Sequence, residues 1–153
     1  MRKISRSALV PYSPSQMYAL VEDVESYPDF LPWCSDAVLH WREGNVLEGS
    51  VEMHRAGLRR RFRTRNTMRQ DEAIDMTLVD GPFSHLSGGW HFVALGTAGC
   101  KVSLEMEFEV RSRATDRLLG RYFEDICNSL VDAFVQRADE TLAMESTEDV
   151  KTD

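Results

Sequence analysis

Apolar and polar residues alternate along most of the chain from Asp36 to Val110. The alternation is clearest in KVSLEMEFEV, residues Lys101 to Val110, where every second residue is apolar. A period of two places neighbouring side chains on opposite faces of a β-strand. The region is interrupted by turn sequences at REGN, RAG, QDEA, VDGPF and LGTAG. We therefore expect about six consecutive antiparallel strands with one buried and one solvent-facing surface.

A helix-start signature precedes this region and follows a predicted first strand, Arg2–Val10. Ser13 is a favourable N-cap residue, and Gln16 three positions later completes a capping box. Pro14 suits the first helical position, so we expect a helix from Pro14 to about Asp23.

The stretch VESYPDFLPWC, Val24–Cys34, combines aromatic residues with two prolines. Pro28 and Pro32 allow at most one or two short helical turns. We expect a compact, kinked connector, which is either a segment of the core or an aromatic lip at the mouth of a cavity.

A long amphipathic helix is predicted from Thr115 to about Ala143. This region lacks proline, and its apolar residues recur at steps of three and four. The order of elements predicts an α+β fold in which a curved antiparallel sheet grips this helix. One helix covers only part of such a sheet, so we expect space between them, with a mouth near the first helix and the connector. We assign residues 1–144 to a single domain and residues 145–153 to a flexible acidic tail.

The composition indicates a folded, water-soluble domain, because 42% of the residues are hydrophobic and 28% are charged. The formal net charge of -7 disfavours indiscriminate binding to nucleic acid, and we expect no DNA partner. No apolar run is long enough for a signal-peptide core or a membrane helix, so the expected location is the cytoplasm. Cys34, Cys100 and Cys127 are far apart in the sequence, and we expect them to be reduced structural cysteines.

The chain contains no motif that indicates catalysis or metal binding. Its four histidines lack the spacing of metal ligands, and there is no GxSxG, Walker or GxGxxG sequence. We expect no metal site, no required cofactor and no enzymatic activity, although sequence leaves open a carboxylate pair inside a cavity.

The predicted inward face of the sheet is rich in methionine and aromatic residues. Flexible, polarizable methionines adapt to an elongated apolar ligand. The alternative is that these residues only fill the core, as apolar faces usually do. The residues are Met53, Met68, Met76 and Met106, joined by Val51, Phe62, Leu78, Trp90, Phe92 and Phe108.

Arginines repeat along the predicted strand RAGLRRRFRTRNTMR and share its outer face. One hypothesis is a docking strip for phosphates, most plausibly of RNA. The other is cross-strand pairing with Glu48, Glu52 and Asp75, which would neutralise much of the charge. The arginines are Arg59, Arg61, Arg63, Arg65 and Arg69.

Several motifs resemble the coenzyme Q-binding and RatA-type branch of the START superfamily, which is also labelled polyketide cyclase/dehydrase-like. The motifs are YPDFLPWC, FRTRN, LVDGPFSHLSGGWHF and AFVQRA, together with Cys100. The resemblance implies a helix-grip fold: a seven-stranded antiparallel sheet wrapped around the C-terminal helix, with a hydrophobic tunnel between them. It further implies that residues of the connector, strands and helix line the tunnel. These are Phe30, Leu31, Trp33, Phe83, Leu86, Trp90 and Phe92, facing Phe123, Ile126, Leu130 and Phe134.

Two functions follow from the resemblance. One arm of the family binds ubiquinone or related polyprenyl lipids without catalysis and supports respiratory electron transfer. The RatA arm binds the large ribosomal subunit, blocks subunit association and inhibits translation initiation. The leading hypothesis is that the protein binds a hydrophobic ligand, ubiquinone, and makes transient contact with the inner-membrane surface. The alternative is that it binds the ribosome through the arginine face.

Overall fold

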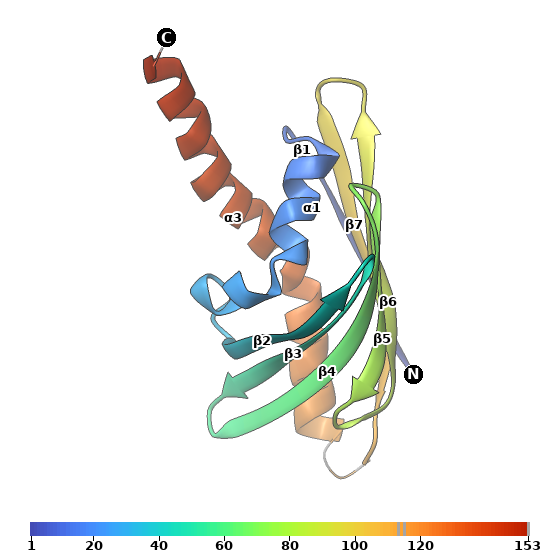
Figure 1. Cartoon of the computed structure of the whole chain (residues 1–153). Helices are drawn as coiled ribbons and strands as arrows, with labels where there is room; N and C mark the ends of the chain where they lie inside the picture. The colour runs from blue at the N-terminus through green and yellow to red at the C-terminus, as the bar shows by residue number, and fades with distance from the viewer. Residues whose placement is uncertain (113, 115, 153) are drawn as a thin grey trace.

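The computed structural model describes residues 1–112, 114 and 116–152, and it has a seven-stranded antiparallel sheet curved around one long helix (Figure 1). The strand order is β1-β7-β6-β5-β4-β3-β2, so β1 joins the far edge of a meander formed by β2 to β7. The strands are β1 (Arg2–Val10), β2 (Cys34–Glu43), β3 (Val46–Arg55), β4 (Leu58–Arg69), β5 (Ala73–Asp80), β6 (Phe83–Leu95) and β7 (Gly99–Val110). The predicted first strand and the six consecutive strands are confirmed, as is the α+β helix-grip fold.

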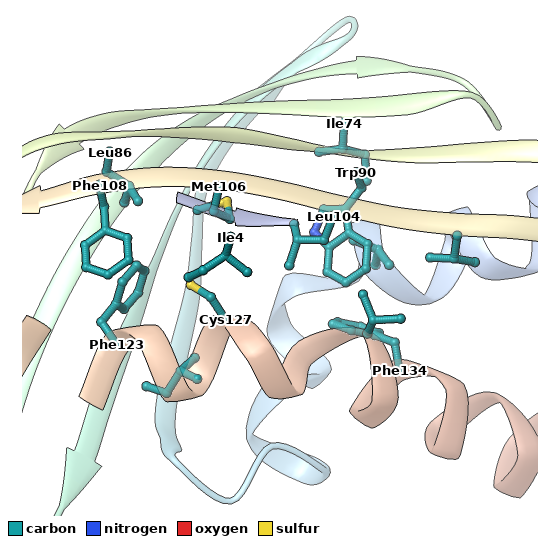
Figure 2. Packing of buried hydrophobic residues seen from close by; sticks show 14 of the residues in the cluster. Ile4, Ile74, Leu86, Trp90, Leu104, Met106, Phe108, Phe123, Cys127 and Phe134 are labelled. Atoms are coloured by element: carbon teal, nitrogen blue, oxygen red, sulfur yellow. The ribbon is translucent and has the colours of Figure 1, made fainter. Parts of the chain in front are cut away.

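The alternation in β7 separates the two faces of the sheet as predicted. Val102, Leu104 and Phe108 are completely buried, whereas the glutamates between them lie on the outer face. Figure 2 shows this inner face packed against the long helix α3, with Phe108 over Phe123 and Trp90 over Phe134.

Helix α1 (Pro14–Glu22) begins at the predicted capping box. The Gln16 backbone N–H donates to the Ser13 hydroxyl at 3.1 Å, and the Ser13 N–H donates to the Gln16 side chain at 2.9 Å. The connector then forms a single short 3-10 helix, η1 (Val24–Asp29), which contains Pro28. This agrees with the short helical turn that the prolines permit.

Helix α3 (Arg121–Thr152) differs from its prediction at both ends. The predicted start, Thr115, lies outside the described residues, and a π-helical turn, η2 (Asp116–Gly120), precedes the α-helix. The helix also continues past Ala143 and projects beyond the sheet (Figure 1). The predicted end was wrong because the last residues contain no proline or glycine that would stop a helix. The backbone of residues 145–152 is therefore helical, while the mobility of this segment and the domain boundary at 144 stay predictions.

Across the described part of the chain, none of the helices combines the length and apolar character needed to span a bilayer.

Candidate ligand cavity and basic face

An apolar cavity of about 90 Å³ lies between the inner face of the sheet and α3. Aromatic side chains form much of its wall, and they meet edge to face: the ring centroids of Phe62 and Phe123 are 5.6 Å apart, and those of Trp90 and Phe134 are 5.2 Å apart. The lining residues are Val24, Tyr27, Trp33, Gly49, Val51, Phe62, Thr64, Asn66, Met76, Leu86, Trp90, Met106, Phe123, Ile126, Cys127, Leu130 and Phe134.

The cavity is much smaller than the tunnel that the resemblance implies. A volume of about 90 Å³ is smaller than the roughly 150 Å³ of an engineered cavity that holds benzene. This conformation therefore has no room for a polyprenyl chain, and binding such a ligand requires the side chains around the cavity to move.

More than half of the residues predicted to line a tunnel do line this cavity. They are Trp33, Phe62, Met76, Leu86, Trp90, Met106, Phe123, Ile126, Leu130 and Phe134. The others do not reach the cavity and pack in the surrounding core, either buried or half-buried. These are Phe30, Leu31, Met53, Met68, Leu78, Phe83, Phe92 and Phe108.

Two polar side chains, Thr64 and Asn66, face the otherwise apolar cavity, and sequence reasoning missed them. The Thr64 hydroxyl donates a hydrogen bond to the Asn66 Oδ1 at 2.9 Å. The alternation of β4 contained the signal, because outward-facing arginines at odd-numbered positions place the even-numbered residues on the inner face. Sequence reasoning also missed four further lining residues, Val24, Tyr27, Gly49 and Cys127.

The cavity offers no acid–base pair for catalysis. Among the described residues that line it, none is a carboxylate, a histidine, a lysine or an arginine. Burial raises the pKa of the Tyr27 hydroxyl and of the Cys127 thiol, so both stay protonated at neutral pH. Within the described residues, no three or more His, Cys, Asp or Glu side chains are grouped to hold a metal ion.

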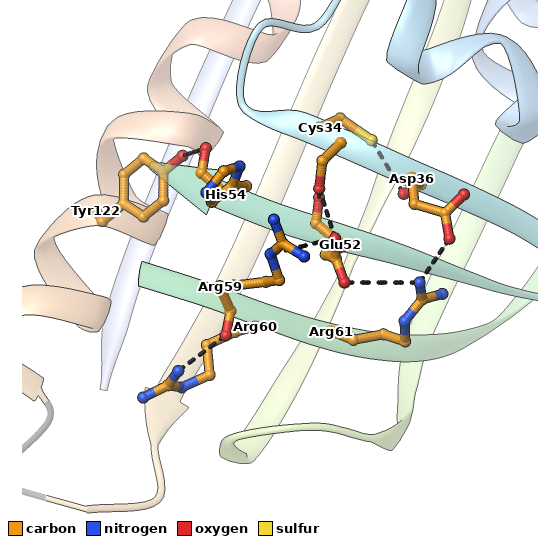
Figure 3. A network of polar contacts seen from close by, with 9 residues as sticks. Cys34, Asp36, Glu52, His54, Arg59, Arg60, Arg61 and Tyr122 are labelled. Atoms are coloured by element: carbon orange, nitrogen blue, oxygen red, sulfur yellow. Dashed lines mark hydrogen bonds and ion pairs between the residues drawn. The ribbon is translucent and has the colours of Figure 1, made fainter. Parts of the chain in front are cut away.

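A second, more open pocket of about 380 Å³ lies beside the cavity. Trp33 and Ile126 line both spaces and therefore separate them. The outer pocket is partly polar: the guanidinium of Arg55 lies 5.3 Å from the centre of the Tyr122 ring, and the Tyr122 hydroxyl donates to the His54 carbonyl at 3.4 Å (Figure 3). We name this space, lined by Pro32, Trp33, His54, Arg55, Tyr122, Asp125, Ile126 and Ser129, the vestibule.

The kinked connector contributes residues both to the core and to the wall of the cavity. Leu31 is buried in the core, while Trp33 stands between the cavity and the vestibule. Phe30 instead packs outside the cavity, 5.2 Å from the Phe134 ring and under the guanidinium of Arg137 at 4.9 Å.

The arginines on the outer face of β4 are paired with acidic residues. Arg63 and Arg65 both contact Glu48, at 2.7 and 2.6 Å. Hydrogen bonds from Arg65 and then from Arg63 lower the pKa of the Glu48 carboxyl below its ordinary value of 4.5. The predicted partner Glu48 is thus observed, and its single carboxylate offsets part of the charge of these two arginines.

The remaining arginine pairs are longer or more exposed. Arg61 contacts Asp36 at 2.5 Å and Glu52 at 3.7 Å (Figure 3). Arg59 lies 3.8 Å from Glu52, with 61% of its side chain exposed. The predicted pair of Arg69 with Asp75 is present at 4.0 Å.

The end of the β3–β4 hairpin carries basic groups outside these pairs. Its two loop residues, Ala56 and Gly57, both have positive φ, which favours a tight two-residue turn. Arg55 and Arg60 are exposed beside the turn, and neither lies within 4.0 Å of a carboxylate in the part of the chain that the structure describes. The Arg60 guanidinium donates to the Arg59 carbonyl at 2.8 Å (Figure 3). We name Arg55, Arg59 and Arg60 the hairpin cluster.

A curved sheet around a long helix, with an apolar cavity between them, defines a helix-grip protein of the START type. A START superfamily protein from Mycobacterium smegmatis has this fold with a TM-score of 0.73 at 19% identity, covering 90% of this chain and 97% of that one. Residues 10–135 match the family model described as polyketide cyclase / dehydrase and lipid transport, and the chain belongs to that family.

The names of two relatives refer to different functions, ribosome association and coenzyme Q binding. The ribosome association toxin RatA of Escherichia coli (strain K12) is 41% identical over 140 residues, which are 92% of this chain and 89% of that protein. The mitochondrial coenzyme Q-binding protein COQ10 homolog B of Xenopus laevis is 28% identical over 140 residues, covering 88% of this chain and 57% of that protein.

Proposed function

We propose that the protein associates with the ribosome, binds its large subunit and thereby opposes subunit association. The observation that carries this proposal is the 41% identity, over nearly the full length of both chains, to a ribosome association toxin. The small cavity also supports it, because about 90 Å³ is too little for the polyprenyl ligand of the competing hypothesis. Action on the ribosome agrees with the expected cytoplasmic location.

The hairpin cluster is the surface that we propose for contact with ribosomal RNA. Its guanidinium groups are exposed, and Arg55 and Arg60 are free of carboxylate partners among the described residues. A phosphate can therefore approach without first breaking an ion pair. Arg63 and Arg65 are less suited, because both already bind the buried carboxylate of Glu48.

Co-sedimentation with purified ribosomal subunits tests this proposal. Binding should weaken steeply as salt rises, because phosphate contacts release counterions. The double variant Arg55→Glu/Arg60→Glu should reduce binding to the large subunit at least tenfold. Lys3→Glu/Lys101→Glu is the matched control, since it makes the same charge change on exposed positions of β1 and β7. Equal loss in both variants would indicate a net-charge effect and exclude the hairpin cluster as the contact, and unchanged binding in both would likewise exclude the hairpin cluster.

We propose as a second function the binding of a small hydrophobic ligand without catalysis. The specific observation is the apolar cavity with its methionine and aromatic walls, which is the kind of site that takes up apolar rings. The 28% identical coenzyme Q-binding relative supports a quinone as the ligand. A membrane-surface contact for collecting such a ligand stays a prediction.

Mass spectrometry of lipid extracted from protein purified from its own host tests the second function. A quinone or polyprenyl lipid recovered in near-equimolar amount supports it. A lipid-free protein that also takes up no short-chain quinone on titration would count against it.

A further inference from the structure

We infer that Thr64 and Asn66 form a hydrogen-bonding anchor that selects a ligand with a carbonyl group on a flat apolar ring. This inference rests on the second function proposed above, because it names the chemistry that the cavity would recognise. It adds a specificity determinant to a cavity whose walls are otherwise apolar.

The anchor has one polar group without a partner. Asn66 is only 8% exposed, and it lies on the inner face of β4 among residues that line the cavity. Its Oδ1 accepts the hydrogen bond from the Thr64 hydroxyl at 2.9 Å. Among the residues that the structure describes, no acceptor is hydrogen-bonded to the Asn66 amide nitrogen. Because Thr64 occupies the oxygen and Asn66 lines the cavity, the two N–H groups are the part of the amide that is available to a ligand.

The Asn66 N–H groups have no acceptor among the described residues, and a ligand that supplies one gains a hydrogen bond in a largely apolar site. The rest of the lining cannot do so, because it consists almost entirely of aliphatic, aromatic and sulfur-containing side chains. A hydrogen bond formed there is also not weakened by competing water in the way that a surface hydrogen bond is. A ligand with a ring carbonyl can therefore accept a hydrogen bond from Asn66, whereas a plain hydrocarbon ring cannot.

The wall beside the anchor is closely packed, so a ring enters only if side chains move. Gly49 pairs with Thr64 across β3 and β4 and also lines the cavity. A side chain at this position would meet the Val24 methyl group at 3.4 Å and the Val38 carbonyl at 3.3 Å, so glycine avoids further crowding of this wall. On the side of the vestibule, movement of Trp33 would join the cavity to the larger outer pocket and admit a ligand.

A matched pair of probes isolates the carbonyl. Acetophenone and α-methylstyrene have nearly the same shape, but the first has a carbonyl oxygen where the second has a methylene group. Affinities for both are measured by NMR titration of the whole protein. The quantity of interest is the ratio of the two affinities, because the different hydration of the free probes cancels when variants are compared.

Asn66→Leu keeps the size of the side chain and removes the amide. We expect the preference for acetophenone over α-methylstyrene to fall about tenfold, which corresponds to 1.4 kcal/mol. Thr64→Val should lower it by a smaller factor, because the amide stays but is no longer oriented. Thr67→Val is the control, since Thr67 is exposed on the opposite face of the same strand and its change should leave the ratio within twofold.

The outcomes separate this inference from the function on which it rests. If the wild-type protein binds both probes and Asn66→Leu leaves the ratio unchanged, the anchor is wrong while a hydrophobic-ligand function survives. If the wild-type protein binds neither probe, both the anchor and that function are overturned. A tenfold fall with an unaltered control supports both.

Discussion

Replacing Phe134 by alanine should destabilise the protein strongly, because this side chain joins α3 to both the sheet and the connector. It is 1% exposed. Its ring meets those of Tyr27, Phe30 and Trp90 edge to face, with centroids 5.5, 5.2 and 5.2 Å away.

The size of the effect follows from two opposing features. Phenylalanine to alanine in a packed core costs about 3–5 kcal/mol, and three edge-to-face pairs favour the upper part of this range because each adds about 0.5–1.5 kcal/mol. The adjacent cavity acts in the other direction, since Phe134 already lacks packing partners on that side. We expect a loss of about 4 kcal/mol for Phe134→Ala, and about 1.5 kcal/mol for Phe134→Leu, which keeps most of the apolar volume.

Urea unfolding followed by circular dichroism measures this loss. With a slope of about 2 kcal/mol per molar urea, the midpoint of Phe134→Ala should fall by about 2 M. Leu118→Ala is the control, because Leu118 is 75% exposed and its change should stay within about 0.5 kcal/mol. A loss below about 2 kcal/mol for Phe134→Ala, with an unchanged slope, would refute the tight packing of α3 against the connector.

Further substitutions test the cap, the sheet, the ion pairs and the partition of the cavity. Ser13→Ala removes the capping box and should cost about 1 kcal/mol in thermal or urea unfolding. Gly88→Ala would place a methyl group against the Glu105 carbonyl, closer than van der Waals contact allows, so it should cost about 3 kcal/mol or prevent folding, as expression and unfolding assays would report. The lowered pKa of Glu48 gives stability that is present above pH 4.5 and is lost as the pH falls through the pKa of the folded state. Glu48→Gln should therefore reduce the loss of stability to urea between about pH 6 and pH 3. An unchanged dependence of stability on pH would contradict the role given to the Glu48 carboxylate. Trp33→Ala joins the cavity to the vestibule and should increase the rate of probe uptake several-fold in stopped-flow measurements, whereas an unchanged rate would place the route of access elsewhere.

Local periodicity was sufficient to predict most of the fold. The period of two in β4 placed its arginines on one face, and antiparallel pairing identified Glu48, Glu52 and Asp75 as their partners. Asp36 was missed because it lies two strands from Arg61: it pairs with Glu52 on β3, which in turn pairs with Arg61 on β4, and the sequence reasoning considered only adjacent strands.

The cavity was harder to predict than the sheet that forms it. Whether an inward-facing side chain borders a void or fills the core depends on how volumes from several elements fit together, and periodicity contains no information about this. Met53 and Met76 show the difficulty: both are inward-facing methionines on neighbouring parts of the sheet, yet only Met76 lines the cavity. The connector has no regular period at all, so its pattern could not decide that Trp33 faces the cavity while Phe30 packs outside it.

The two proposed functions meet on strand β4. Thr64 and Asn66 of β4 face the cavity, while Arg59 and Arg60 of the hairpin cluster lie at the start of the same strand and Arg55 ends β3. A ligand at Thr64 and Asn66 and an RNA at the hairpin cluster would therefore contact different residues, although Arg55 also lines the vestibule. Because the residues of a strand share one backbone, a shift of β4 that makes room for a ring must also move Arg59 and Arg60. This geometry allows ligand uptake to alter docking, and it makes simultaneous measurement of both activities more informative than either alone.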